Sequence, residues 1–160
     1  MDRAYDVIVV GGGVAGAHTA MAVARFSNGQ LRILLIDRND SKEFGKKTRT
    51  GWSCGDAVSK KSLDYACSNL GISYGFPEVE HKVEGVLVYS PDHESKVLFD
   101  GEGYILNRRV WASRQLEYLE KFGVEVRHGL DAQTLIADNG YVRGVKCKDL
   151  GSGEELNFYA

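Results

Sequence analysis

Hydrophobic residues recur along the chain with two different periods, and this pattern predicts the secondary structure. A run rich in β-branched residues, Tyr5 to Val10, predicts a buried parallel strand. Three glycines follow it, and an alanine-rich stretch from Ala15 to about Arg25 then predicts a helix. A second apolar run, Ile33–Ile36, ends in Asp37. The chain is therefore expected to begin with a strand–helix–strand unit, with a glycine-rich turn before its helix.

A long polar segment and a second helix are predicted next. Residues 38–53 are rich in charge and glycine, which is typical of a long loop. A helix is expected to begin near Asp56, a favourable capping residue, and to end at Gly71. Its apolar positions recur at helical spacing and place Cys67 in the core. The basic residues of the loop either face phosphate groups or belong to a solvated surface: Lys42, Lys46, Lys47 and Arg49.

Beyond Lys82 the pattern changes to short strands around one further helix. Turn signals at Ser90–Asp92 and at Asp100–Gly101 separate the first predicted strands. These three strands are Val83–Tyr89, Lys96–Phe99 and Gly103–Leu106.

The last part of the chain predicts a return to the first sheet and then a separate meander. A helix from about Arg108 to Phe122 precedes a short strand, Val124–Arg127, which continues the parallel sheet. Three further strands, joined by glycine-containing turns, predict the meander: Ala132–Ala137, Tyr141–Lys148 and Glu154–Tyr159. The fold class expected from this order is α/β. It is a Rossmann-like, three-layer FAD- or NAD(P)-binding domain with an inserted β-meander.

Composition and charge narrow the class of protein. The chain has 160 residues, of which 43% are hydrophobic and 26% charged, as in soluble globular proteins. Its net charge of −2 gives no basic field for nucleic acid, and no apolar run is long enough to span a bilayer. Its cysteines (54, 67 and 147) fit neither a disulfide framework nor a metal site. Because the start also lacks a signal peptide, we expect a cytoplasmic protein.

The glycines of the first turn predict a site for a dinucleotide. Gly11, Gly13 and Gly16 fit the pattern G-x-G-x-x-G, placed between a strand and a helix. The first permits the tight turn, the second admits a pyrophosphate, and the third lets the helix pack closely on the sheet. Asp37 lies 21 residues after Gly16, where a carboxylate binds ribose hydroxyls and disfavours a 2′-phosphate. FAD or NAD is therefore expected; the alternative is a βαβ unit whose turn binds no ligand.

Three motifs resemble the geranylgeranyl reductase family of FAD-dependent enzymes. They are Tyr5–Gly13, Cys54–Lys60 and Gly103–Arg108, and the cysteine motif is the most specific of them. The resemblance extends over essentially the whole chain and is strongest to archaeal members that saturate isoprenoid lipids. It implies a fold of the para-hydroxybenzoate hydroxylase type.

The resemblance also implies roles for individual residues. Arg108 is expected to open the long helix and reach the cofactor, with a surface arginine as the alternative. The backbone of Ala132 is expected to meet the adenine, and residues 55–57 to lie along the flavin side. The full set of implied FAD-binding residues is Gly11, Gly13, Val14, Ala15, Gly16, Asp37, Arg38, Gly55, Asp56, Ala57, Arg108 and Ala132.

Cys54 is the candidate catalytic residue. It lies in a glycine-containing turn before a predicted helix, where the free N–H groups and helix dipole favour the thiolate. Because the resemblance places this motif beside the flavin, Cys54 either delivers a proton or shapes the pocket. The alternative is a structural cysteine of the turn.

The function implied by the resemblance is FAD-dependent reduction of carbon–carbon double bonds in geranylgeranyl or other isoprenoid lipid chains. The electron donor is left open between NAD(P)H and a ferredoxin-like protein, and peripheral membrane contact is expected of a full-length enzyme. Residues 1–160 are expected to form an incomplete FAD-binding domain, without its last Rossmann strand, a later Gly-Asp motif and the substrate domain. Two alternatives remain: an aromatic hydroxylase or halogenase of the same fold, and a non-catalytic nucleotide-binding fragment.

Overall fold

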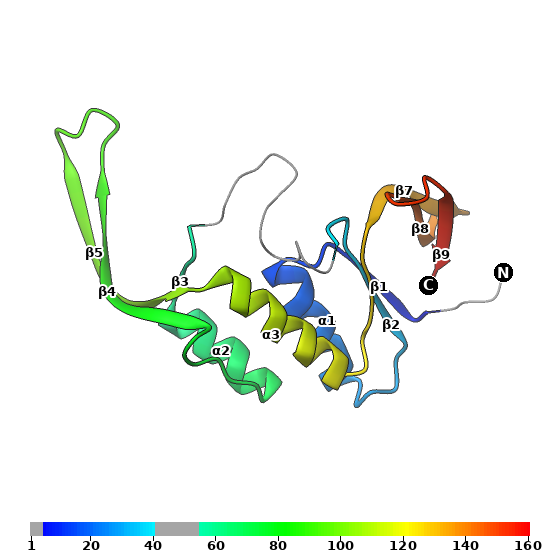
Figure 1. Cartoon of the computed structure of the whole chain (residues 1–160), viewed down its shortest axis with the longest axis horizontal. Helices are drawn as coiled ribbons and strands as arrows, with labels where there is room; N and C mark the ends of the chain where they lie inside the picture. Colours follow the sequence, from blue (N-terminus) through cyan, green and yellow to red (C-terminus); the bar gives the residue numbers. More distant parts are fainter. Residues whose placement is uncertain (1–4, 41–54) are drawn as a thin grey trace.

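The structure of the protein is a computed structural model that describes residues 5–40 and 55–160. In this part of the chain, three helices and three small β-sheets form an elongated body from which one long β-hairpin projects (Figure 1). No helix within the described ranges is long and apolar enough to cross a lipid bilayer.

A parallel sheet lies at the centre of the fold. Its strands are β1 (Val7–Val10), β2 (Ile33–Ile36) and β6 (Glu125–Arg127), in the order β1-β2-β6. Both pairings are parallel, and all four residues of β2 are buried. A parallel strand covered on both faces needs such a continuous apolar run. The predicted strand–helix–strand unit and the returning strand are thus confirmed.

Helices cover one face of this sheet and the meander covers the other. Helices α1 (Val14–Phe26) and α3 (Arg108–Lys121) share a core with the buried side chains of Ile33 and Leu35. Leu34 and Ile36, which alternate with them, pack against the meander. The meander strands are β7 (Leu130–Asp138), β8 (Tyr141–Asp149) and β9 (Glu155–Tyr159). The three-layer arrangement is confirmed, because alternate side chains of one strand enter two different cores.

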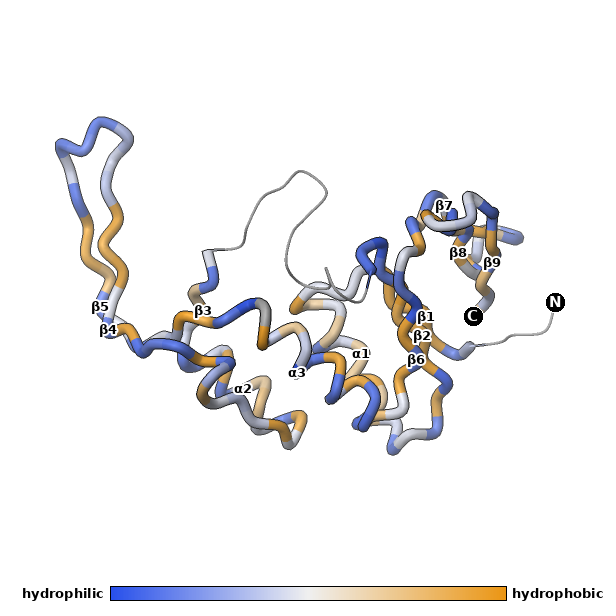
Figure 2. Tube along the Cα trace, viewed as in Figure 1, coloured by the Kyte–Doolittle hydropathy of each residue, from blue (hydrophilic) through white to orange (hydrophobic). Residues whose placement is uncertain are grey.

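A second, antiparallel sheet and a further helix extend away from the parallel sheet. Strand β3 (Ala57–Ser59) leads into helix α2 (Lys60–Leu70), and strands β4 (Val79–Tyr89) and β5 (Lys96–Leu106) form the projecting hairpin. The sheet order is β3-β5-β4, with antiparallel pairing throughout. The hydropathy of the trace shows that the projecting part of the hairpin is largely apolar up to its polar tip (Figure 2).

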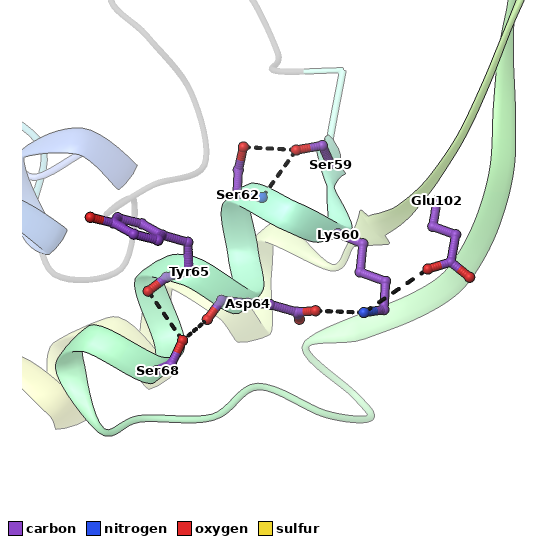
Figure 3. A network of polar contacts seen from close by, with 7 residues as sticks. All are labelled: Ser59, Lys60, Ser62, Asp64, Tyr65, Ser68 and Glu102. Atoms are coloured by element: carbon purple, nitrogen blue, oxygen red, sulfur yellow. Dashed lines mark hydrogen bonds and ion pairs between the residues drawn. The ribbon is translucent and has the colours of Figure 1, made fainter.

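Two sequence-based predictions are wrong here. The second helix does not begin near Asp56: this residue has a left-handed backbone (φ 59°), a short strand follows it, and Ser59 caps α2 instead. The Oγ of Ser59 accepts a hydrogen bond from the N–H of Ser62 (Figure 3). The Asp100–Gly101 turn is also absent, because Asp100 pairs with Gly85 and β5 continues through both residues. Tertiary pairing along β4 outweighs the local turn preference at this point.

The other elements lie close to their predicted positions. Helix α3 is capped by the side chain of Asn107, and the meander turns lie at the predicted glycines. Cys147 is fully buried in the meander core, and Cys67 packs against the cluster around Leu63 and Trp111. Both thiols therefore have packing roles, as expected for Cys67.

Candidate functional site

The predicted cofactor residues gather at the carboxyl edge of the parallel sheet. Strand β1 ends there and leads directly into α1, so the N-terminus of α1 faces this edge. Helix α3 precedes the parallel strand β6, so it runs opposite to the strands and also begins on this side. Ligands of open α/β sheets bind outside the carboxyl ends of the strands, and this edge is the candidate site.

The turn between β1 and α1 needs its glycines for two separate reasons. Gly11 has φ 97°, a backbone conformation that other residues rarely adopt, and its N–H donates to the carbonyl of Ile36 at 2.8 Å. At Gly16, a Cβ would lie 1.8 Å from the carbonyl oxygen of Gly11. Helix α1 therefore packs directly on the turn, and only glycine fits there. The roles predicted for Gly11 and Gly16 agree with this geometry.

The start of α1 is open toward solvent and suited to an anion. Gly13 is the N-cap residue, has no capping side chain, and a Cβ built there would meet no atom within 4 Å. Gly13, Val14 and Ala15 are exposed, and the first turn of the helix contains no acidic residue. Uncapped N–H groups and the positive end of the helix dipole are the features that bind phosphates. The residues present thus fit a pyrophosphate group.

Asp37 links the end of β2 to the glycine turn. Its Oδ2 accepts a hydrogen bond from the N–H of Gly12 at 2.6 Å, and its Oδ1 accepts one from the N–H of Asn39 at 2.7 Å. The residue is 7% exposed. Each carboxylate oxygen keeps a further lone-pair site, so contact with ribose hydroxyls remains compatible with these bonds. The sequence pattern indicated the ribose role but not the bond to the turn.

Arg38 and Ala132 lie beside the same edge. Nη1 of Arg38 is 4.0 Å from Oδ1 of Asp131, a contact that ties the residue after Asp37 to strand β7. Ala132 packs against the core cluster of Leu34 and Ile36 at the end of β2. The structure therefore brings the residues expected around the adenosine part of a dinucleotide to one side of the sheet.

A second group of predicted residues meets at the start of α3. Nε of Arg108 donates to Oδ1 of Asp56 at 3.0 Å, and the carbonyl of Asp56 accepts from the N–H of Leu106 at 2.8 Å. Asn107 caps α3 and donates through Nδ2 to Oε1 of Glu80 at 2.8 Å. Arg108 is therefore held by the residue that precedes β3, while its neighbour Asn107 is held by β4. Gly55 and Ala57, which flank Asp56, are exposed.

His18 joins the two helices that begin at the site. Its Nδ1 is 2.8 Å from the carbonyl of Val14 in the first turn of α1, and 3.3 Å from Nε2 of Gln115 in α3. The ring lies in an aromatic cluster with Tyr74 and Trp111. Burial lowers the pKa of His18, although its bond to Val14 acts in the opposite direction. The imidazole therefore packs between α1 and α3.

Cys54, the predicted catalytic residue, lies outside the described residues, as do the four basic residues of the predicted loop. The structure places the adjacent Gly55 and Asp56 next to Arg108. Within residues 5–40 and 55–160, no group of three histidine, cysteine or acidic side chains is arranged to hold a metal ion.

Comparison with known proteins agrees with this geometry. The chain is 36% identical over 157 residues to the digeranylgeranylglycerophospholipid reductase of Sulfolobus acidocaldarius, an alignment that covers 98% of this chain and 32% of the relative. The chain is a homologue of these reductases. It spans about a third of the length of the curated reductases that it matches. No family model matches the sequence.

Solved structures show the same fold. A geranylgeranyl bacteriochlorophyll reductase-like protein from Thermoplasma acidophilum superposes with a TM-score of 0.75 at 27% identity, over 98% of this chain and 37% of that protein. A myxobacterial chondrochloren halogenase, described as a variant of FAD-dependent halogenases, superposes with a TM-score of 0.74 at 23% identity. This superposition covers 99% of this chain and 36% of the halogenase chain. At this level of sequence identity, it supports similarity of fold alone. The Thermoplasma acidophilum protein, by contrast, is similar to this chain in both fold and sequence.

Proposed function

We propose that this chain is the FAD-binding part of an enzyme that reduces carbon–carbon double bonds in geranylgeranyl or related isoprenoid lipid chains. The observation that carries the proposal is the 36% identity to a digeranylgeranylglycerophospholipid reductase over 98% of the chain. The glycine turn, Asp37 and the Asp56–Arg108 pair supply the elements that such an enzyme needs for its cofactor.

Each part of the carboxyl edge has a role in this proposal. The N–H groups at the start of α1 (Gly13, Val14 and Ala15) hold the pyrophosphate, and Asp37 accepts from the ribose hydroxyls. Arg38 and Ala132 flank the adenosine half. Gly55, Asp56 and Ala57 line the other half, where Arg108 is kept in place by its bond to Asp56.

The bound flavin would supply the hydride-transfer chemistry, and the protein supplies position, shielding and a proton. An isolated alkene develops no oxyanion, so alignment of the double bond and exclusion of water matter more than charge stabilisation. Cys54 is proposed to hold the proton that the second alkene carbon receives, or to shape the pocket there. The electrons for the flavin would come from NAD(P)H as a hydride, or from a ferredoxin-like donor as two single electrons with the protons taken from solvent. The full-length enzyme contacts the membrane surface from the cytoplasmic side.

The cofactor part of the proposal is tested by titrating the chain with FAD, NAD and NADP and following flavin fluorescence or heat of binding. FAD is expected to bind most tightly. Arg108→Gln is expected to weaken FAD without unfolding the chain, because an ion pair that is partly exposed contributes only ~0–1 kcal/mol to stability. Arg143→Gln, an exposed change in β8, is the matched control.

The catalytic part is tested in a chimera. This chain replaces the aligned 157 residues of the Sulfolobus acidocaldarius relative, and reduction of a geranylgeranyl lipid by the chemically reduced enzyme is measured anaerobically. Flavin reoxidation that requires the lipid supports the proposal. A chimera that binds FAD but is reoxidised only by O₂ in the presence of an aromatic substrate would replace it with the hydroxylase alternative.

A further inference from the structure

His18 connects the starts of the two helices that meet at the candidate site. Helices α1 and α3 lie side by side and share a core (Figure 1). Nδ1 of His18 lies 3.3 Å from Nε2 of Gln115, and the imidazole stacks against Trp111 with the ring centroids 6.3 Å apart. Gln115 and Trp111 are each 1% exposed. The described residues therefore enclose this contact by themselves, whatever a longer protein packs against them.

The bond to Val14 indicates which ring nitrogen carries the proton. Nδ1 lies 2.8 Å from the carbonyl oxygen of Val14, and a carbonyl oxygen can only accept a hydrogen bond. Burial lowers the pKa of His18, which favours the uncharged ring with a single proton at neutral pH. That proton therefore lies on Nδ1. The amide of Gln115 accepts from it only when its oxygen, rather than its nitrogen, is turned toward the ring.

The other ring nitrogen, Nε2, makes histidine an expensive residue for packing alone. It is buried and has no hydrogen-bond partner among residues 5–40 and 55–160. Nε1 of Trp111 and the hydroxyl of Tyr74 likewise have no described partner, so neither of these neighbours bonds to it. Burying an unpaired polar atom costs free energy, and a phenylalanine ring would fill the same space without that cost. Packing alone therefore does not account for a histidine here, whereas the bond from Nδ1 does.

The bond from Nδ1 acts on a peptide group at the start of α1. The carbonyl of Val14 and the N–H of Ala15 belong to the same planar peptide unit, so holding one fixes the direction of the other. A hydrogen bond to the carbonyl also polarises this unit, which makes its N–H a stronger donor. Ala15 is one of the exposed residues whose N–H groups are proposed to hold the pyrophosphate. On its other side the ring packs against α3, which begins with Arg108.

We propose that His18 is a positioning residue of the cofactor site, which directs the N–H of Ala15 toward the pyrophosphate through the bond from Nδ1 to the carbonyl of Val14. His18 acts through this peptide unit and does not itself hold the cofactor. Its contact with Gln115 and Trp111 keeps the start of α1 in a fixed relation to α3. This role rests on the proposed FAD site.

FAD titration and thermal unfolding of the same His18 variants test this role. His18→Phe keeps a ring of similar size but loses the donor, so it is expected to unfold near the wild-type temperature and to bind FAD about three- to tenfold more weakly. His18→Asn places an amide nitrogen at the position of Nδ1 and is expected to recover most of the lost affinity. His18→Gln, the matched control, places its amide at the position of Nε2 and is expected to recover none. Helix propensity favours glutamine over asparagine and would give the opposite order.

The tautomer is tested separately by nitrogen NMR of the chain labelled at its histidine rings, with the His18 signals identified by their absence from His18→Asn. A protonated Nδ1 and an unprotonated Nε2 are expected, and the reverse overturns the proposal. A His18→Phe variant that binds FAD as tightly as the wild type also overturns it, as does equal FAD affinity of His18→Asn and His18→Gln. Failure of the wild type to bind FAD would instead overturn the proposed function, and the role of His18 with it.

Discussion

The N–H of Gly12 donates a hydrogen bond of 2.6 Å to Oδ2 of Asp37, and this bond joins the glycine turn to the end of the neighbouring strand. The carboxylate is almost fully buried and also accepts from the N–H of Asn39. Asp37 therefore shapes the turn before any ligand is present. A residue expected only to contact ribose also holds the backbone that would contact the phosphates.

Asp37→Ala is expected to lower both stability and FAD affinity. Two hydrogen bonds to a charged group are lost, each contributing ~1.5–3 kcal/mol, and the buried N–H of Gly12 loses this acceptor. Thermal unfolding of the unliganded chain measures the first effect, and FAD titration measures the second. Asp138→Ala, an exposed change at a meander turn, is the control. Unchanged stability would show that the bond to Gly12 does not hold the turn.

Gly16→Ala and Gly13→Ala are expected to separate folding from ligand binding. The Cβ at position 16 would lie 1.8 Å from the carbonyl of Gly11, so α1 must shift, at a cost of ~1–3 kcal/mol or more. The Cβ at position 13 meets no atom, so the unliganded chain should keep its stability. It would, however, occupy the space proposed for the pyrophosphate and weaken FAD. If Gly13→Ala bound FAD as tightly as the wild type, the pyrophosphate would not lie against residue 13.

Glu78 and Arg114 are expected to make stability depend on pH in the acid range. Burial acts to raise the pKa of Glu78, but the 2.8 Å hydrogen bond from Nε of Arg114 and other bonds outweigh it, so the pKa lies below its ordinary value of 4.5. A lowered carboxyl pKa means that its stabilisation is complete above 4.5 and is lost as the pH falls through the lower, folded value.

Glu78→Gln should therefore lower stability at neutral pH and flatten its decline in acid. Chemical unfolding between pH 3 and 7 measures both effects, and Glu154→Gln serves as an exposed control. If the stability of Glu78→Gln declined in acid as steeply as that of the wild type, the Glu78 carboxylate would not be the cause of the pH dependence.

Cys54→Ala, introduced into the chimera described above, is expected to keep FAD and lose alkene reduction. Proton transfer contributes ~10²–10⁴-fold, so a catalytic thiol leaves a plain deficit in a single-turnover assay. Cys54→Ser should retain part of the activity if the shape of the pocket is what matters. Cys67→Ala is the control, since that thiol packs beside Leu63 and Trp111. If Cys54→Ala reduced the alkene at nearly the wild-type rate, the thiol would have no catalytic role and would serve only the structure of the turn.

The parallel sheet and the glycine turn could be predicted because their signals are local. A buried apolar run, a positive-φ glycine and a helix of small residues each act within a few positions of the chain. Asp56 and Asp100 show where such reasoning fails. Both have turn-forming or capping preferences, yet Asp56 leads into a strand and Asp100 continues one, because pairing with β5 and β4 decides their conformation.

The side-chain contacts of the candidate site could not be predicted, because they join distant parts of the sequence. The Asp56–Arg108 pair and the His18–Gln115 contact each link elements that only the tertiary fold brings together. Spacing in the sequence could place Arg108 at the start of a helix. It could not show which carboxylate would hold it there.

Helices α1 and α3 run in the same direction, so the positive ends of both helix dipoles lie at one edge of a chain whose net charge is negative. The chain carries −2, but two helix N-termini with no acidic residue in their first turns face the same edge, with Arg108 beginning one of them. These positive ends attract an anionic ligand as it approaches, although the carboxylates of Asp37 and Asp56 at the same edge offset part of the attraction. Added salt screens this attraction, so it should lower the association rate of an anionic ligand while leaving its dissociation rate nearly unchanged.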